Sequence, residues 1–114
     1  GLPVPFLGQP SSAVVGPATF AKKFDSPVVP IFASRKPEGG HIVHILPPLH
    51  YKHSGDDDVD MYTLTEECVR VTEDFIREHP DEWIWFQHRW MTKMSEIVDY
   101  DKKLEIRERA HEKQ

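Results

Sequence analysis

Hydrophobic positions along the chain form short apolar runs that proline, glycine and charged residues separate. The first run, 2–7, contains two prolines, which remove ladder donors, so we expect an extended edge segment followed by a turn at 8–12. A helix is then predicted to begin at Pro17, where a missing N–H costs nothing. It should end by Asp25, because a proline follows two positions later.

Two apolar runs in the middle of the chain predict a β-hairpin. Residues 27–33 are short and rich in β-branched side chains, which favours a buried strand over a helix, and Pro30 indicates that one side is not fully paired. Gly39-Gly40 is a plausible turn, and 41–46 reads as the returning strand. Apolar residues occupy both faces of that strand.

The second half of the chain changes to a helical period. The polar, acidic stretch 51–60 predicts a loop, and Thr63 opens a capping box from which a helix should run to the break at His79-Pro80. A second helix is expected over 81–94, and beyond Ser95 charge dominates, which predicts an exposed helix or a frayed tail. The apolar stripe of the first helix consists of Leu64, Cys68, Val71 and Phe75.

Composition limits the class of protein. A length of 114 residues fits one small α/β domain, which we divide into a folded part, 1–94, and a charged tail, 95–114. The net charge of −5 argues against a general nucleic-acid surface, and the single Cys68 excludes an internal disulfide. No apolar run approaches the roughly 20 residues that span a bilayer. Because the chain opens without Met in an apolar segment, we expect a piece of a longer protein.

Three tryptophans lie close together near the end of the predicted folded part. Trp83 and Trp90 are seven residues apart and share a helix face, which core packing explains. Trp85 points elsewhere and is a candidate for a membrane interface, where tryptophan is favoured. Arg89 is a candidate contact for an anionic lipid, with an ordinary solvated charge as the alternative.

Four segments, in order, resemble the bacterial lipid A biosynthesis acyltransferases. Residues 4–10 (Val-Pro-Phe-Leu-Gly-Gln-Pro) resemble the family's Phe-Phe-Gly-x-Pro segment, and 16–21 resemble the small-residue helix that follows it. Residues 27–32 are similar to its apolar strand with a central proline. Residues 76–85 are similar to its closing motif, which has an Ile-Arg/His-Pro pair before Glu-Gln-Trp-Leu-Trp. Leu7 departs from the second Phe, and 87–89 reads Gln-His-Arg instead of His-Arg-Arg.

The resemblance implies transfer of an acyl group from an acyl carrier protein thioester to a hydroxyl of a lipid A precursor, without a cofactor. In the family a His takes the hydroxyl proton, and an acidic residue, separated from the His by four intervening residues, orients the imidazole. That dyad lies upstream of the Phe-Phe-Gly segment, so we expect it before Gly1 and expect residues 1–114 to be inactive alone. His53 and Asp58 have the same spacing but lie downstream, which leaves them as the alternative dyad.

Substrate-binding candidates are few, and each has a structural alternative. Phe6, beside the flexible Gly8, is a candidate lining of an acyl channel or a plain core residue. Gly16 begins a helix whose free N–H groups suit a phosphate, or is simply a helix start. Arg35 is a candidate contact for an anionic headgroup or a solvated charge at a strand end.

Two histidine pairs invite a metal interpretation that we do not adopt. His41 and His44 are three apart on a predicted strand and face opposite sides, which is poor geometry for one ion. His50 and His53 adjoin the acidic loop, where histidines are mostly solvated.

Two hypotheses follow from the sequence. The first is a fragment of a membrane-associated acyltransferase at the cytoplasmic face of the bacterial inner membrane. Its fold would be part of a mixed-sheet α/β structure, with a hairpin-like strand pair, one short helix and two C-terminal helices. Its uncovered sheet edge predicts self-association. The second is a complete small α+β binding module that uses the acidic loop and charged tail as interaction surfaces.

Overall fold

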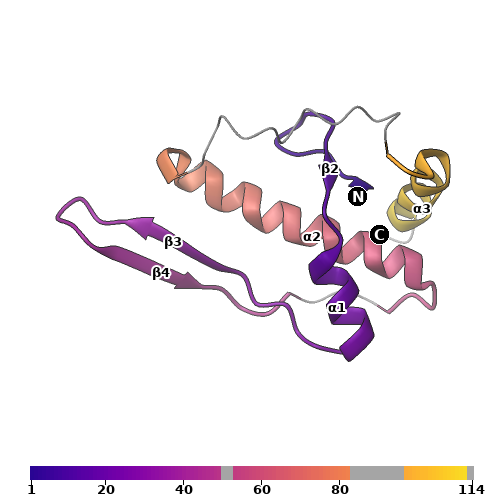
Figure 1. Cartoon of the computed structure of the whole chain (residues 1–114), viewed down its shortest axis with the longest axis horizontal. Helices are drawn as coiled ribbons and strands as arrows, with labels where there is room; N and C mark the ends of the chain where they lie inside the picture. Colours follow the sequence, from indigo (N-terminus) through magenta and orange to yellow (C-terminus); the bar gives the residue numbers. More distant parts are fainter. Residues whose placement is uncertain (50–52, 83–96, 113–114) are drawn as a thin grey trace.

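The long helix α2 crosses the molecule, and the other elements are arranged around it (Figure 1). The computed structural model describes residues 1–49, 53–82 and 97–112. Within these residues the fold is α/β, as the sequence predicts, and it has two antiparallel two-stranded sheets, of which only the hairpin pair was expected. In chain order the elements are β1 (Leu2–Pro3), β2 (Ser12–Ala13), α1 (Gly16–Phe24), β3 (Ile31–Arg35), β4 (His41–Ile45), α2 (Asp57–Glu78), the 3-10 turn η1 (Pro80–Glu82) and α3 (Tyr100–Glu112).

The N-terminal segment is extended, as its prolines predict, but its turn comes earlier than the predicted 8–12, and an unpredicted strand, β2, follows it. Strands β1 and β2 pair antiparallel, with Leu2 opposite Ala13. Between them the chain reverses at Leu7 (φ 51°) and Gly8 (φ 81°), both in the left-handed region. The Leu7 N–H donates to a Glu73 carboxylate oxygen at 2.6 Å. This bond ties the turn to α2 and offsets part of the strain of a non-glycine residue at positive φ.

Helix α1 is confirmed with both of its predicted ends. Pro17 lies in its first turn, and Asp25 ends it in the left-handed conformation (φ 50°). The buried side of the helix consists of Ala18 and Ala21, whose small side chains let it approach α2.

The predicted hairpin is also confirmed, although its first strand begins later than expected. Strand β3 starts at Ile31, because Pro30 has no N–H to donate to a ladder. Before it only Val28 is bridged, to Leu49. The two glycines of the turn have φ values of 102° and 84°, which side chains rarely adopt. The register places Ile31 opposite Ile45.

The start predicted for α2 is wrong. The helix begins at Asp57, within the stretch predicted to be a loop, and Thr63 lies inside it. The actual N-cap is Asp56, whose carboxylate accepts from the N–H groups of Asp58 and Val59 at 3.1 and 3.3 Å. Acidic side chains that made the stretch look like a loop instead favour the positive end of the helix dipole. The end before Pro80 is as predicted.

Two clusters of buried side chains lie on different sides of α2. One joins α2 to the N-terminal segment and α3, and its largest members, Tyr62 and Phe6, are fully buried. The Tyr62 hydroxyl donates to the Pro3 carbonyl at 3.0 Å, and burial raises the pKa of the Tyr62 phenol. The other cluster joins α2 to α1 and includes Ala18, Ala21 and Leu64, with Cys68 partly buried beside them.

The charged C-terminal residues form a helix that packs on the core. Ile106 and Ala110 of α3 are buried in the Tyr62 cluster, and the Arg109 Nε donates to Asp56 at 3.1 Å. The second helix predicted over 81–94 and the three tryptophans lie outside the described residues, apart from η1 at its start. Within the described residues, no helix is both long and apolar enough to cross a bilayer.

Candidate functional site

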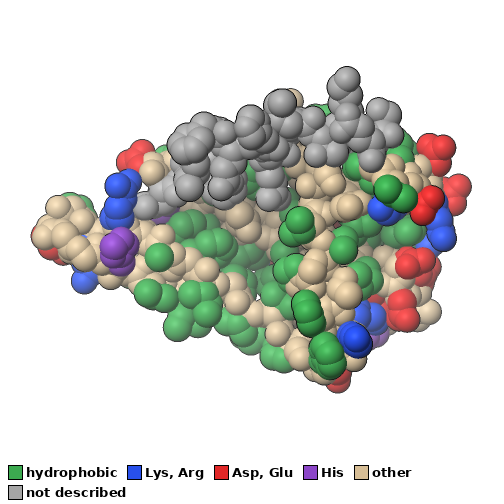
Figure 2. Space-filling view, in the orientation of Figure 1, with side chains coloured by type: hydrophobic (Ala, Val, Ile, Leu, Met, Phe, Trp, Pro, Cys, Tyr) green, Lys and Arg blue, Asp and Glu red, His purple; other side chains and the backbone are tan. Residues whose placement is uncertain are grey.

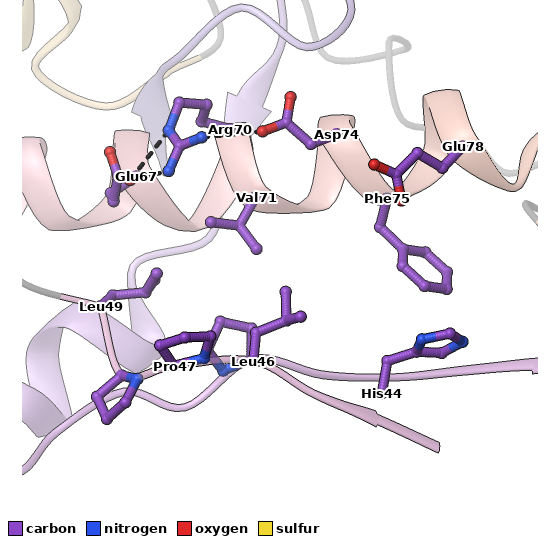
Figure 3. Close-up of a pocket in the computed structure, with 12 residues that line it drawn as sticks. His44, Leu46, Pro47, Leu49, Glu67, Arg70, Val71, Asp74, Phe75 and Glu78 are labelled. Atoms are coloured by element: carbon purple, nitrogen blue, oxygen red, sulfur yellow. Dashed lines mark hydrogen bonds and ion pairs between the residues drawn. The ribbon is translucent and has the colours of Figure 1, made fainter. Parts of the chain in front are cut away.

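A groove of about 520 Å³ lies between α2 and the chain that leaves β4 (Figure 3). Apolar side chains come from both sides of it and point toward one another. Charged side chains follow one edge, along α2. The apolar lining residues are Pro30, Leu46, Pro47, Pro48, Leu49, Val71 and Phe75, and the charged ones are Glu67, Arg70, Asp74 and Glu78, with His44 at one end.

Local sequence explains how the apolar walls form. Pro47 and Pro48 end the hydrogen-bond ladder between β3 and β4, and the chain continues in an extended conformation. Two backbone bonds still hold it to the segment that precedes β3, from Leu46 N–H to the Pro30 carbonyl at 3.0 Å and from Leu49 N–H to the Val28 carbonyl at 2.8 Å. Opposite, Val71 and Phe75 are one helical turn apart and share a face of α2.

The charged edge of the groove is internally paired. The Arg70 guanidinium donates to Glu67 and, at 2.9 Å, to Asp74. These residues lie three and four positions from Arg70, the spacing at which helix side chains meet. The hydrogen bond that Arg70 donates to the Glu67 carboxylate is the main cause that raises the pKa of Arg70. The edge therefore presents three acidic side chains and one basic one beside an apolar trough, and the basic Arg70 is paired with two of the acidic ones.

An aromatic and histidine cluster closes one end of the groove. The rings of Phe32 and Phe75 stack with centroids 4.4 Å apart, and His44 and His79 each lie against Phe75, at 5.4 and 4.4 Å. Ser34 Oγ and His44 Nε2 are 2.7 Å apart. That distance suits a serine nucleophile with its base. However, Ser34 is only 4% exposed, so we assign the pair to the packing of the hairpin on α2.

A second polar cluster joins α1 to the start of α2. Asp60 is 1% exposed and accepts from the Ser54 N–H at 3.0 Å, the Ser54 hydroxyl at 2.8 Å and Lys22 Nζ at 3.3 Å. Lys22 also pairs with the exposed Asp57 at 3.1 Å. Burial alone would raise the pKa of Asp60, but the bonds from Ser54 and Lys22 outweigh it and hold that pKa below its ordinary value. Nothing in the sequence pattern distinguished Asp60 from its acidic neighbours.

The four predicted substrate-binding residues are not brought together. Phe6 is fully buried in the core, and Gly8 lies in the adjoining turn. Gly16 is the first residue of α1, and Arg35 is the last of β3, where its guanidinium donates to the Asp81 carbonyl at 3.4 Å. Figure 1 shows the N-terminal turn, the start of α1 and the tip of the hairpin in three separate parts of the molecule. Their roles in binding stay predictions.

The described residues of the alternative dyad and of the histidine pairs lie at separate places in the structure. Asp58 is exposed in the first turn of α2. His53 lines a smaller hollow of about 280 Å³ beside α1. His41 lies on the exposed face of β4, whereas His44 faces α2. In the described part of the chain no three His, Cys, Asp or Glu side chains are grouped to hold a metal. Trp85, Arg89 and His50 lie outside the described residues.

The model of one protein family, the bacterial lipid A biosynthesis acyltransferases, matches residues 1–92. The chain belongs to this family. No curated protein and no solved structure matches it. In this lipid A acyltransferase chain the matched region contains every residue that lines the groove, whereas α3 lies beyond it.

Proposed function

We propose that the chain is the C-terminal part of an enzyme that transfers a fatty acyl group from an acyl carrier protein thioester to a hydroxyl of a lipid A precursor. We place that enzyme at the cytoplasmic face of the inner membrane. The observation that carries the proposal is the family match over residues 1–92. The donor, the acceptor hydroxyl and the location follow from the family resemblance.

Within that enzyme we assign the groove beside α2 to an acyl chain. Its volume lies within the range of about 300–1,000 Å³ that is typical of small-molecule sites. Its walls are aliphatic and proline side chains from two separate segments, so a methylene chain would bury apolar surface on both sides. The paired charges of Arg70, Glu67 and Asp74 would stay solvated at the edge.

We also propose that residues 1–114 have no transferase activity alone. In the family the His that removes the acceptor proton lies before the Phe-Phe-Gly segment, which corresponds here to residues 4–10. Asp58 is exposed in the first turn of α2, where an acidic side chain favours the positive end of the helix dipole. An Asp held at a helix start in this way supports a structural role and not the orientation of an imidazole.

The test compares two proteins in an assay with radiolabelled acyl carrier protein thioester and lipid A precursor. One is expressed from the full coding sequence, including whatever precedes Gly1, and the other is residues 1–114. The first should transfer the acyl group and the second should not. Turnover by residues 1–114 that His53→Ala abolishes would overturn the proposal.

The groove has its own test in the longer protein. Leu46→Asp places a charge in the apolar wall, and we expect it to raise the KM for the acyl donor or acceptor at least tenfold. Val98→Asp is the matched control, because Val98 is 73% exposed and lies outside the groove. Equal effects of the two substitutions would remove the groove from the proposal.

A further inference from the structure

The groove beside α2 has ends of different chemistry. Figure 3 shows Phe75 and His44 at one end and Leu49 at the other. Beyond Leu49 the lining continues into the smaller hollow of about 280 Å³, since Pro48 and Leu49 line both. The polar side chains of that hollow are those of Asp25, Ser26 and His53. A ligand with a hydrocarbon chain and a polar end would therefore place the polar end beside Leu49 and the end of its chain against Phe75, because burial of a polar group without partners is unfavourable.

The end at Phe75 is built from three separate elements. The Phe75 ring of α2 stacks on Phe32 of β3, with centroids 4.4 Å apart and an angle of 11° between the ring planes. His44 of β4 presents its edge to Phe75 at 5.4 Å, and its Nε2 is 2.7 Å from Ser34 Oγ. His79 lies 4.4 Å from Phe75 on the same helix side. Each ring is thus held by a neighbour from another element or turn, so that none can move aside without disturbing the packing. We call the rings of Phe32, His44 and Phe75 the aromatic stop.

We propose that the aromatic stop, through Phe75, sets the length of the acyl chain that the enzyme accepts from its donor. This inference rests on the assignment of the groove to an acyl chain under the proposed function, and it identifies the residue that decides between chains. The occupant is the donor chain, because an acyl thioester carries one linear chain and the groove is a single trough. Each methylene that fits between the walls strengthens binding about fourfold. A methylene beyond the stop finds no such contact.

The position of the stop is measured by calorimetric titration of residues 1–114 with octyl, decyl, dodecyl and tetradecyl maltoside below their micelle concentrations. The neutral headgroup avoids repulsion by the acidic edge of the groove. Affinity should rise with chain length and then level off where the groove is full. In Phe75→Ala, the affinity for tetradecyl relative to octyl maltoside should rise about tenfold or more, because several more methylenes fit. In Phe75→Trp, the same ratio should fall at least about fourfold.

Phe24→Ala is the matched control, because it removes the same atoms outside the groove. Figure 2 shows hydrophobic side chains at the surface of α1, and Phe24 of that helix is 60% exposed and stacks on Phe20. The substitution should change the ratio of affinities by less than about twofold. Phe75→Leu keeps an apolar side chain at the stop and serves if Phe75→Ala does not fold by circular dichroism. It should shift the ratio in the same direction, about threefold.

The donor is tested in the longer protein with lauroyl, myristoyl and palmitoyl thioesters of acyl carrier protein and one acceptor. Phe75→Ala should raise kcat/KM for the palmitoyl donor relative to the lauroyl donor about tenfold or more. A shift in the maltoside series without a shift in this ratio would overturn the donor assignment, because the groove would then hold a chain of the acceptor.

The stop itself is overturned if maltoside affinity does not depend on chain length, or if Phe75→Ala and Phe24→Ala change the ratio of affinities equally. These titrations need no acyl transfer. Absence of transfer by the longer protein would therefore overturn the proposed function and the donor assignment, whereas the maltoside series would still decide whether Phe75 ends the groove.

Discussion

The buried carboxylate of Asp60 provides the sharpest test of how the start of α2 is stabilised. It accepts three hydrogen bonds, two from Ser54 and one from Lys22. Asp60→Asn keeps the side-chain volume but removes the negative charge. It also places the amide N–H groups of the new side chain against Ser54 and Lys22, which are themselves donors. A bond to a charged group contributes about 1.5–3 kcal/mol, and Lys22 retains Asp57, so we expect a loss of about 2–3 kcal/mol in the free energy of unfolding. The melting temperature should fall on the order of 10 °C.

The pH dependence of this loss follows from the lowered pKa of Asp60. The unfolded carboxyl titrates near its ordinary value of about 3.9, and the folded one titrates below it. The stabilisation is therefore complete above the unfolded pKa and is lost as pH falls through the folded pKa. Urea denaturation at a series of pH values should show a constant difference between the two proteins from about pH 7 to 5 and a shrinking difference below about pH 4.

Asp57→Asn is the matched control for Asp60→Asn. Asp57 pairs with the same Lys22 at 3.1 Å, but its side chain is 87% exposed. We expect a change within about 0.5 kcal/mol, because an exposed ion pair contributes little. The reasoning fails if both substitutions have the same effect, or if the difference for Asp60→Asn persists undiminished at pH 3.

Three further predictions concern folding. Tyr62→Phe should cost about 1–2 kcal/mol in chemical denaturation, because the Pro3 carbonyl loses its buried donor; a smaller change would show that water replaces the hydroxyl. Asp25→Gly should stabilise the protein by about 0.5–1 kcal/mol in the same assay, because it relieves a left-handed residue at the end of α1. Ile106→Ala should cost about 2–4 kcal/mol, which a frayed α3 would not show.

Elements with local signals were predicted correctly from the sequence. Pro17 and Pro27 define the ends of α1 through proline geometry alone, and Gly39-Gly40 defines the hairpin turn through its positive φ values. The start of α2 was missed, because acidic residues are equally frequent in loops and in the first turn of a helix. What decides between the two is tertiary: Asp60 is buried against Lys22 of α1, 38 positions away in the sequence.

The groove was only partly predictable for the same reason. The helical period placed Val71 and Phe75 on one face, which is one wall. The opposite wall depends on where the chain passes after β4, and backbone bonds from Leu46 and Leu49 to the segment before β3 determine that path. The resemblance to the family pointed instead to Phe6, because that residue lies in the segment that resembles the family's Phe-Phe-Gly-x-Pro. In the structure that residue is part of the core.

The inner side of the hairpin forms the end of the groove, and its outer side is exposed. Its strands carry apolar residues on both sides, a pattern typical of strands that are covered on both sides. Phe32 stacks on Phe75 of α2 on the inner side, whereas Ile45 and Val43 are exposed on the outer side. Burial of the outer side against another surface would satisfy the pattern, because Ile45 and Val43 would then be removed from water.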